Sequence, residues 1–151
     1  MPTVQTSFNA TQAPAFLGQI ADGEQVTNVI SRTIDQASVS PVNFGDPVLQ
    51  GASDGTVQSV AGGSGPFRGI AVRDATLPPS AGDQYAAGLT AAVMTKGSIW
   101  VNAAAAVTAG QPAYFTAAGA LTNVATSNTA IAGAIWDSTT GAAGLAKLRL
   151  G

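Results

Sequence analysis

The chain has 151 residues and a formal net charge of −2 at pH 7, and 9% of its residues are charged, against about 25% in an ordinary soluble domain. It contains neither cysteine nor histidine, which excludes disulfide bonds, thiolate metal sites, cysteine nucleophiles and the usual general base near neutral pH. The composition predicts one domain from which much enzyme chemistry is removed, and we expect no metal site. Its neutral surface is suited to burial against other proteins or, alternatively, belongs to a monomer kept soluble by hydroxyls and amides.

Two classes of partner are not expected. The six basic residues are dispersed along the chain and form no patch that could follow a phosphate backbone, so nucleic acid is excluded. No apolar run approaches the roughly 20 residues needed to cross a bilayer, and the N-terminal residues lack the basic and hydrophobic regions of a secretion signal. We therefore expect no membrane partner and no secretion.

Residues 1–17 are predicted to form an extended arm, because Pro2 and Pro14 disfavour a helix. The arm carries two aromatic residues, Phe8 and Phe16. It is either a frayed terminus or a strap that docks these rings on its own barrel or on a neighbour. Residues 18–151 are predicted to form a single β-barrel domain.

The first predicted strand covers residues 26–34, which are rich in β-branched side chains and follow a turn at residues 22–24. Residues 45–74 come next: a Gly-x-Pro turn, a short strand, a glycine turn, a second strand, a loose segment and a third strand ending at an aspartate.

A second copy of this plan covers residues 110–137. Gly45 maps on Gly110 (110 − 45 = 65) and Gly69 on Gly133 (133 − 69 = 64). Upstream, the same offset of 65 maps Val29 on Met94, Ile34 on Ile99 and Val42 on Val107. The alternative is chance, because Gly, Ala, Thr and Val are common here. Two copies favour one pseudo-symmetric barrel or sandwich over a solenoid.

Between the copies, residues 85–94 are predicted as a strand and Lys96-Gly97 as the turn into a second strand over residues 98–102. In that strand Ile99 and Val101 share one face and Trp100 takes the other. The tail, residues 145–150, alternates strictly, with Ala146, Leu148 and Leu150 inward and both charges outward, and closes the sheet.

No residue pattern indicates catalysis. The carboxylates nearly all neighbour Gly or Pro or lie where the strand pattern breaks, which is typical of turn caps. Asp74 and Asp137 occupy equivalent places in the two copies and could face each other as the acid pair of a glycoside hydrolase, which is a remote alternative.

Four strings resemble a known family: ISRT at residues 30–33, FRGIAVRD at 67–74 with TLP at 76–78, VMTKGSIWV at 93–101, and GLAKLRL at 144–150. Together they look like the structural cement (head decoration) proteins of tailed bacteriophages, with a likeness that runs from about Gln5 to Gly151. Gln111 departs from the acidic residue that the family more often has between Gly and Pro in the second copy, and this departure touches only a turn.

The resemblance implies an all-β domain, a β-barrel or jelly roll with pseudo-repeated hairpins, without catalysis or cofactor. It implies a protein made in the bacterial host cytoplasm that sits on the capsid exterior of the virion and ties neighbouring major capsid protein subunits together. We expect a homo-oligomer, a trimer rather than a dimer, and contacts through Phe8, Phe16, Trp100 and Trp136. The competing class is a carbohydrate-binding or fibre-associated β domain, in which Trp100, Trp136, Tyr85 and Tyr114 would form a stacking platform.

Overall fold

The computed structural model describes residues 14–22, 27–77 and 82–151, and within these ranges the chain forms strands and no helix. The predicted all-β fold is confirmed. None of the described residues belongs to a helix that could span a bilayer. The strands are β1 (Ile20–Asp22), β2 (Asn28–Ile34), β3 (Val42–Asn43), β4 (Pro47–Gln50), β5 (Thr56–Ser59), β6 (Phe67–Ala71), β7 (Gln84–Tyr85), β8 (Thr90–Ala103), β9 (Pro112–Phe115), β10 (Leu121–Thr122), β11 (Thr129–Trp136) and β12 (Gly144–Leu150).

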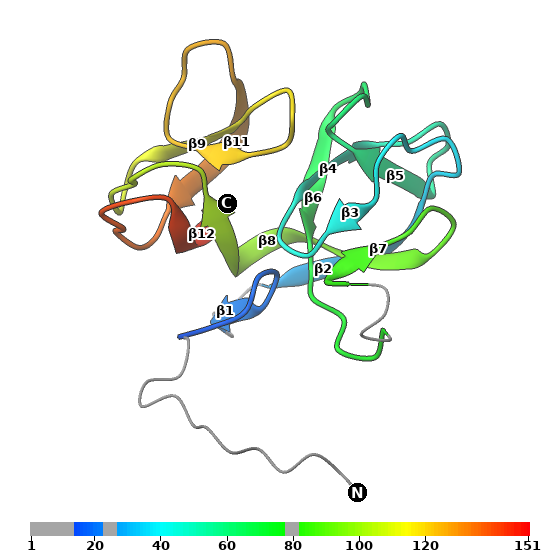
Figure 1. Ribbon diagram of the computed structural model, residues 1–151, viewed down its shortest axis with the longest axis horizontal. Helices are drawn as coiled ribbons and strands as arrows, with labels where there is room; N and C mark the ends of the chain where they lie inside the picture. The colour runs from blue at the N-terminus through cyan, green and yellow to red at the C-terminus, as the bar shows by residue number, and fades with distance from the viewer. Residues whose placement is uncertain (1–13, 23–26, 78–81) are drawn as a thin grey trace, which may run out of the picture.

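The main sheet closes on itself twice through β8 (Figure 1). In the first circuit β8 pairs with β2, followed by β5, β4 and β6, and β6 returns to β8. In the second circuit β8 pairs with β12, followed by β11, β9 and β10, and β10 returns to β8. We call these the first and the second barrel. Each closed circuit leaves few strand edges exposed.

Strand β8 belongs to both barrels, and this corrects the prediction of a turn at Lys96-Gly97. The segment from Thr90 to Lys96 pairs with β2, and the segment from Gly97 to Ala103 pairs with β12. Gly97 has a φ of 118°, a value that glycine adopts without strain. The glycine therefore redirects the strand from one barrel into the next without reversing it.

The predicted repeat is the relation between the two barrels. Strands β4, β5 and β6 lie in the first copy, and β9, β10 and β11 lie in the second. Gly45 and Gly110 both take positive φ, 84° and 88°. Gly69 and Gly133 both lie where the strand register shifts by a bulge, as glycines in strands commonly do.

Two of the three upstream matches were aligned wrongly. Val29 and Met94 are direct partners on the neighbouring strands β2 and β8 and are therefore not equivalent positions. The true offset of the first strand follows from its parallel partner. Val57 and Leu121 each follow a turn glycine by two residues, and Ile34 pairs with Val57 as Ala103 pairs with Leu121, so the shift is 69 (103 − 34). The loop after the first strand is shorter in the second copy, which a constant offset cannot represent. The match of Val42 with Val107 holds, because both form the short pairing that caps a barrel.

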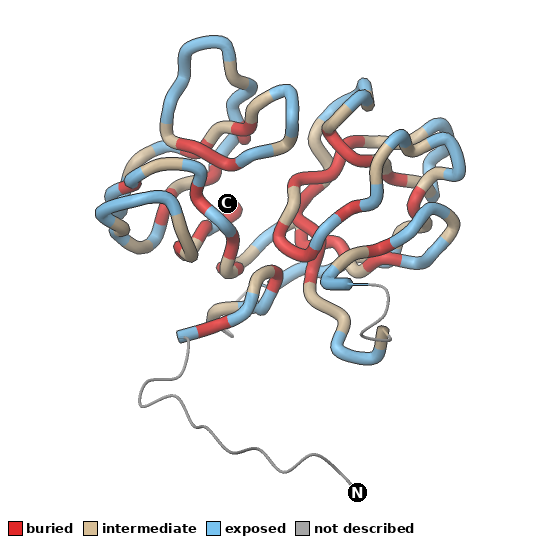
Figure 2. The backbone as a smooth tube through the Cα atoms, in the orientation of Figure 1, coloured by how far each residue is buried: buried red, intermediate tan, exposed pale blue. Residues whose placement is uncertain are grey.

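Buried residues occur in both barrels (Figure 2), and they form two apolar clusters that hold the molecule together. The first fills the first barrel and includes Ile34, Val48, Tyr85 and Val93. The second fills the second barrel and extends across the outer face of the first, through Leu49, Ile70, Val72 and Met94.

Successive residues of β4 and β6 therefore point into different clusters, Val48 and Ala71 into the first and Leu49 and Ile70 into the second. The rings of Phe67 in β6 and Phe115 in β9 stack at 6.0 Å between centroids across the junction. The barrels are thus joined by a shared core as well as by a shared strand.

Candidate interaction surface

The root of the N-terminal arm, residues 14–22, is fixed to the junction of the two barrels. The Gly18 N–H donates to the Trp100 carbonyl oxygen at 2.7 Å, and the Gly18 carbonyl accepts from the Arg73 N–H at 2.8 Å. A Cβ on Gly18 would lie 2.8 Å from the Arg73 nitrogen and 2.9 Å from the Gly45 nitrogen, so only glycine fits there. Ala15 is buried. The root therefore holds a defined place at the junction of the two barrels.

Phe16 presents a large apolar ring at this place, with 60% of its surface exposed. The guanidinium carbon of Arg73 lies 5.0 Å from the centroid of the Phe16 ring and 5.5 Å from that of Phe44. Arg73 also forms an ion pair with Asp83 at 3.1 Å. Cation–π contact positions the exposed ring, as is typical of an anchor residue at a protein interface.

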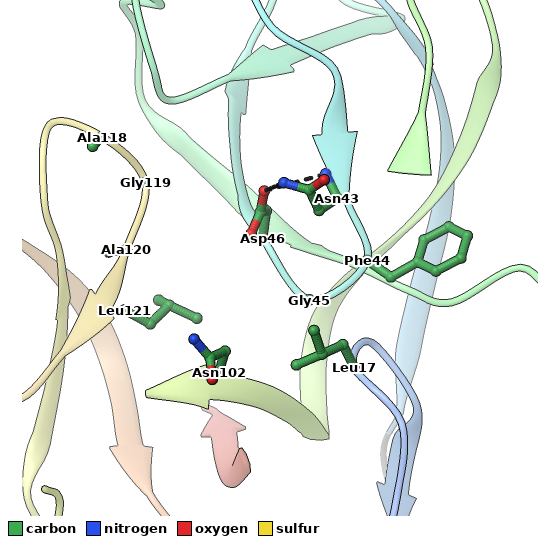
Figure 3. A pocket seen from close by; sticks show the side chains of 10 residues that line it. All are labelled: Leu17, Asn43, Phe44, Gly45, Asp46, Asn102, Ala118, Gly119, Ala120 and Leu121. Carbon is green, nitrogen blue, oxygen red and sulfur yellow. Dashed lines mark hydrogen bonds between the residues drawn. The ribbon is translucent and has the colours of Figure 1, made fainter. Parts of the chain in front are cut away.

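A cleft between the barrels adjoins the root and has a volume of about 360 Å³. Figure 3 shows Leu17 and Asn102 at one side, the turn from Asn43 to Asp46 at another, and the β9–β10 turn at the third. The Asp46 carboxylate accepts hydrogen bonds from the Asn43 N–H at 3.2 Å and its side-chain amide at 2.8 Å. Burial raises the pKa of Asp46, and the bonds from Asn43 partly offset that effect.

This cleft offers hydrogen bonds and one half-buried carboxylate, and its described residues form no catalytic constellation. No group of three or more carboxylates that could hold a metal ion occurs among the described residues. Asp74 accepts from the N–H and the hydroxyl of Thr76, at 2.8 and 2.6 Å, which lowers its pKa. Asp74 therefore caps a turn, as the sequence predicted. It follows β6 of the first barrel, whereas Asp137 follows β11 of the second.

The four predicted contact residues have different environments. Phe16 is exposed, and Phe8 lies outside the described residues. Trp100 is half-buried, with the Lys147 ammonium 5.6 Å from its ring centroid. Trp136 is 0% exposed in the core of the second barrel and cannot touch a partner in this structure. It lies inside because alternate residues of β11 face the barrel interior.

Burial also removes the predicted stacking platform for sugars. Tyr85 and Trp136 are both 0% exposed. The Tyr85 hydroxyl donates to the Val72 carbonyl oxygen at 2.7 Å, which satisfies its polar group inside the first barrel. Two of the four aromatic residues of the platform therefore face protein cores.

The sequence indicated the turn-capping role of Asp46, and the structure shows that cap. Sequence reasoning missed the place of Asp46 in the cleft, and it gave no functional role to Asn43 or Arg73. The Asp46 carboxylate accepts from the N–H of Asn43, and the Gln111 side-chain oxygen accepts from the N–H of Thr108 at 2.9 Å. The donors are 65 residues apart (108 − 43), and so are the acceptors (111 − 46). The repeat therefore marks a side chain that caps the turn before β4 and β9. Gln111 keeps this bond although it is not acidic, so the turn is preserved. Arg73 had no comparable signal, because its contacts join segments distant in sequence.

The comparisons with known proteins agree with this arrangement. A family model described as structural cement protein (E217 gp24/Pam3 gp6) matches residues 4–151. A chain of the solved capsid of Myoviridae phage XM1 is similar in fold, with a TM-score of 0.74 and 21% sequence identity over 99% of this chain and 98% of that chain. No curated protein matches the sequence significantly. The family match spans nearly the whole chain, and the protein belongs to the structural cement proteins of phages.

Proposed function

We propose that this protein binds the outer surface of an icosahedral phage head and ties neighbouring major capsid protein subunits together, without catalysing a reaction. As a structural cement protein it is a component of the virion with a capsid cement role. The observation that carries the finer proposal is the exposed Phe16 ring on a root that is hydrogen-bonded to both β8 and Arg73. A contact residue on a rigid support loses little conformational entropy when it binds.

We place the contact surface around the arm, with Phe8, Phe16 and Trp100 as its aromatic residues. Trp136 is left out because it is buried. Each phenylalanine would contribute about 1.5–3 kcal/mol when fully covered. Over the many copies on a shell, even the lower value would raise the resistance of the head to heat and osmotic stress.

The proposed partners are the major capsid protein and further copies of this chain, with a trimer favoured over a dimer. The low charge supports this proposal, since 9% charged residues leave a surface that loses little solvation when it is buried. We propose that the protein is made in the host cytoplasm and joins the head from outside.

Capsid binding can be measured with heads that lack the protein. We expect Phe16→Ser to weaken retention on the head, and heads decorated with this variant to burst at lower temperature than wild type. Val39→Ser is the matched control, because Val39 is an exposed apolar residue (75%) on the loop between β2 and β3. Equal retention of wild type and Phe16→Ser would refute the contact. Failure of the wild type to bind heads would refute the proposed function.

A further inference from the structure

The two barrels differ at one strand edge. In the second barrel, residues 18–22 cover the edge of β8 next to β10: Ile20 pairs with Ile99. The Trp100 N–H donates to the Gln19 carbonyl oxygen at 2.8 Å, and the Trp100 carbonyl accepts from Gly18. The chain thus adds a strand to this edge from the segment that directly follows the arm.

The equivalent edge of the first barrel belongs to β2. The backbone N–H of Asp35 donates to the Val57 carbonyl oxygen at 2.7 Å, and the backbone N–H of Ala104 donates in the same way to the Leu121 carbonyl oxygen at 2.8 Å. The offset between donors is 69 (104 − 35), which makes Ser31 the counterpart of Trp100 (31 + 69 = 100). On this side, β2 pairs with β5 at Thr33 and Ile34.

No described strand covers the remainder of this edge, residues 28–32, which we call the β2 edge. Along a strand, the backbone N–H and C=O groups of successive residues point to opposite sides. The Ile34 N–H donates to the Leu89 carbonyl oxygen, in the segment leading into β8. The N–H and C=O groups of Val29 and Ser31 therefore point away from β8. An unpaired row of this kind is a template for another strand.

The chemistry of the β2 edge also favours strand addition. Natural edges are usually protected by charged residues, yet Asn28, Val29, Ile30 and Ser31 are uncharged and Val29 is 40% exposed. Two charged residues lie close to the edge: Lys96 pairs with Asn28 from β8, and Arg32 donates from Nη1 to the Ser31 carbonyl oxygen at 2.7 Å. Arg32 thereby occupies the acceptor that a bound strand would use, and it is displaced when the strand binds.

We propose that the β2 edge accepts residues 4–8 of a second copy of this chain as an added strand. The sequence V-Q-T-S-F alternates, so Val4, Thr6 and Phe8 would share one face. Residues 1–21 carry no charged side chain, which matches the neutral edge. Residues 9–13 then link the strand to the fixed root and reach about 17 Å when extended. This inference rests on the proposed role of the arm as a strap and names the surface that receives it.

The decisive variant is Ser31→Pro. Proline removes the outward N–H, and its ring is tolerated on an edge strand whose N–H does not join the ladder. We expect the melting temperature to stay close to that of wild type and the dissociation constant for self-association, from sedimentation velocity, to rise about tenfold or more. Ser31→Ala keeps the N–H and should behave as wild type.

A mixing experiment separates binding to a second copy from binding within one chain, and it does not depend on the folding of one variant. The deletion of residues 1–13 keeps the β2 edge but has no arm, and Ser31→Pro keeps the arm but has no edge. Each variant alone should sediment as a monomer, and their mixture should form heterodimers. Absence of heterodimers together with wild-type self-association would show that the arm binds elsewhere and would overturn the inference.

Two further results would also overturn it. The first is a wild-type protein that is monomeric at every concentration tested. The second is a Ser31→Pro variant that self-associates normally but is lost from heads, which would assign the edge to a capsid segment. If instead wild type fails to bind heads while the mixing experiment succeeds, the proposed function fails and the edge contact stands.

Discussion

Among single residues, glycines that allow close approach between backbone segments influence how the strands meet more than side-chain chemistry does. Gly18 lets the arm root contact Arg73, and Gly69 lets β6 cross β8 beside Met94. The polar residues that matter act as caps: Asp46 and Gln111 hold equivalent turns in the two copies. These positions fix where the strands begin and how closely the barrels meet.

Gly69→Ala should destabilise the protein by about 2 kcal/mol or more, because φ is 151° and the new Cβ would clash with the Met94 carbonyl oxygen and lie 2.7 Å from Val93 Cγ1. Urea unfolding measures the change. Gly141→Ala is the control: a Cβ there meets nothing within 4 Å, so its effect should stay within about 0.5 kcal/mol. Equal effects of the two substitutions would contradict the close approach.

Asp46→Asn should stabilise the protein at pH 7 more than at pH 3. Burial raises the pKa of Asp46, so the fold favours the protonated carboxyl. Its contribution to stability is greatest below the pKa of the unfolded chain and declines as the pH rises through the folded-state pKa. Asparagine stays neutral and can still accept from the Asn43 N–H. Thermal melts at both pH values measure the difference. A variant less stable at pH 7 than at pH 3, relative to wild type, would contradict this.

At the scale of elements, β8 organises the molecule. It supplies the last strand of the first barrel and the first strand of the second, and its face at Met94 joins the cluster that spans both. Strands β4 and β6 are buried on both faces for the same reason. A strand buried on both faces reads as a continuous apolar run instead of an alternating one, as Val48-Leu49 and Ile70-Ala71-Val72 do.

The contact between β6 and β9 predicts energetic coupling between the barrels. In a double-mutant cycle, Phe67→Leu and Phe115→Leu should show a coupling of about 0.5–1.5 kcal/mol, since their rings stack at 6.0 Å. Phe44 lies in the other cluster, so Phe44→Leu and Phe115→Leu should be additive. A coupling of zero for the first pair would mean that the barrels do not meet through these rings in solution.

At the scale of the whole molecule, the two barrels cannot be separated without breaking β8 and the shared cluster. Thermal unfolding should therefore be a single transition with equal calorimetric and van't Hoff enthalpies. The fragments 27–96 and 97–151 should show no cooperative transition alone, because each loses a face of its core. Deletion of residues 1–13 should leave one transition. Two resolved transitions in the intact protein would show that the barrels are independent domains.

Features that are local or periodic could be predicted from the amino-acid sequence. Alternation placed Ala146, Leu148 and Leu150 inside, glycine spacing revealed the repeated hairpins, and the absence of cysteine and histidine excluded disulfide bonds and thiolate metal sites. The family strings indicated a cement protein, which the family match confirms. Phe16 was proposed as a contact residue, and its exposure is compatible with that role.

Which strands share a partner could be seen only in the folded molecule. Lys96-Gly97 has the composition of a turn, but pairing with β2 on one side and β12 on the other holds β8 extended. Trp136 is wrong as a contact residue, and Tyr85 is buried instead of forming part of the alternative stacking platform, because periodicity assigns residues to a face without telling which face is covered. The cleft at Asp46 and Asn102 joins residues of different barrels. Such features depend on pairing between segments that are distant in the sequence. The free energy of that pairing depends on both segments together, so neither segment alone predicts it.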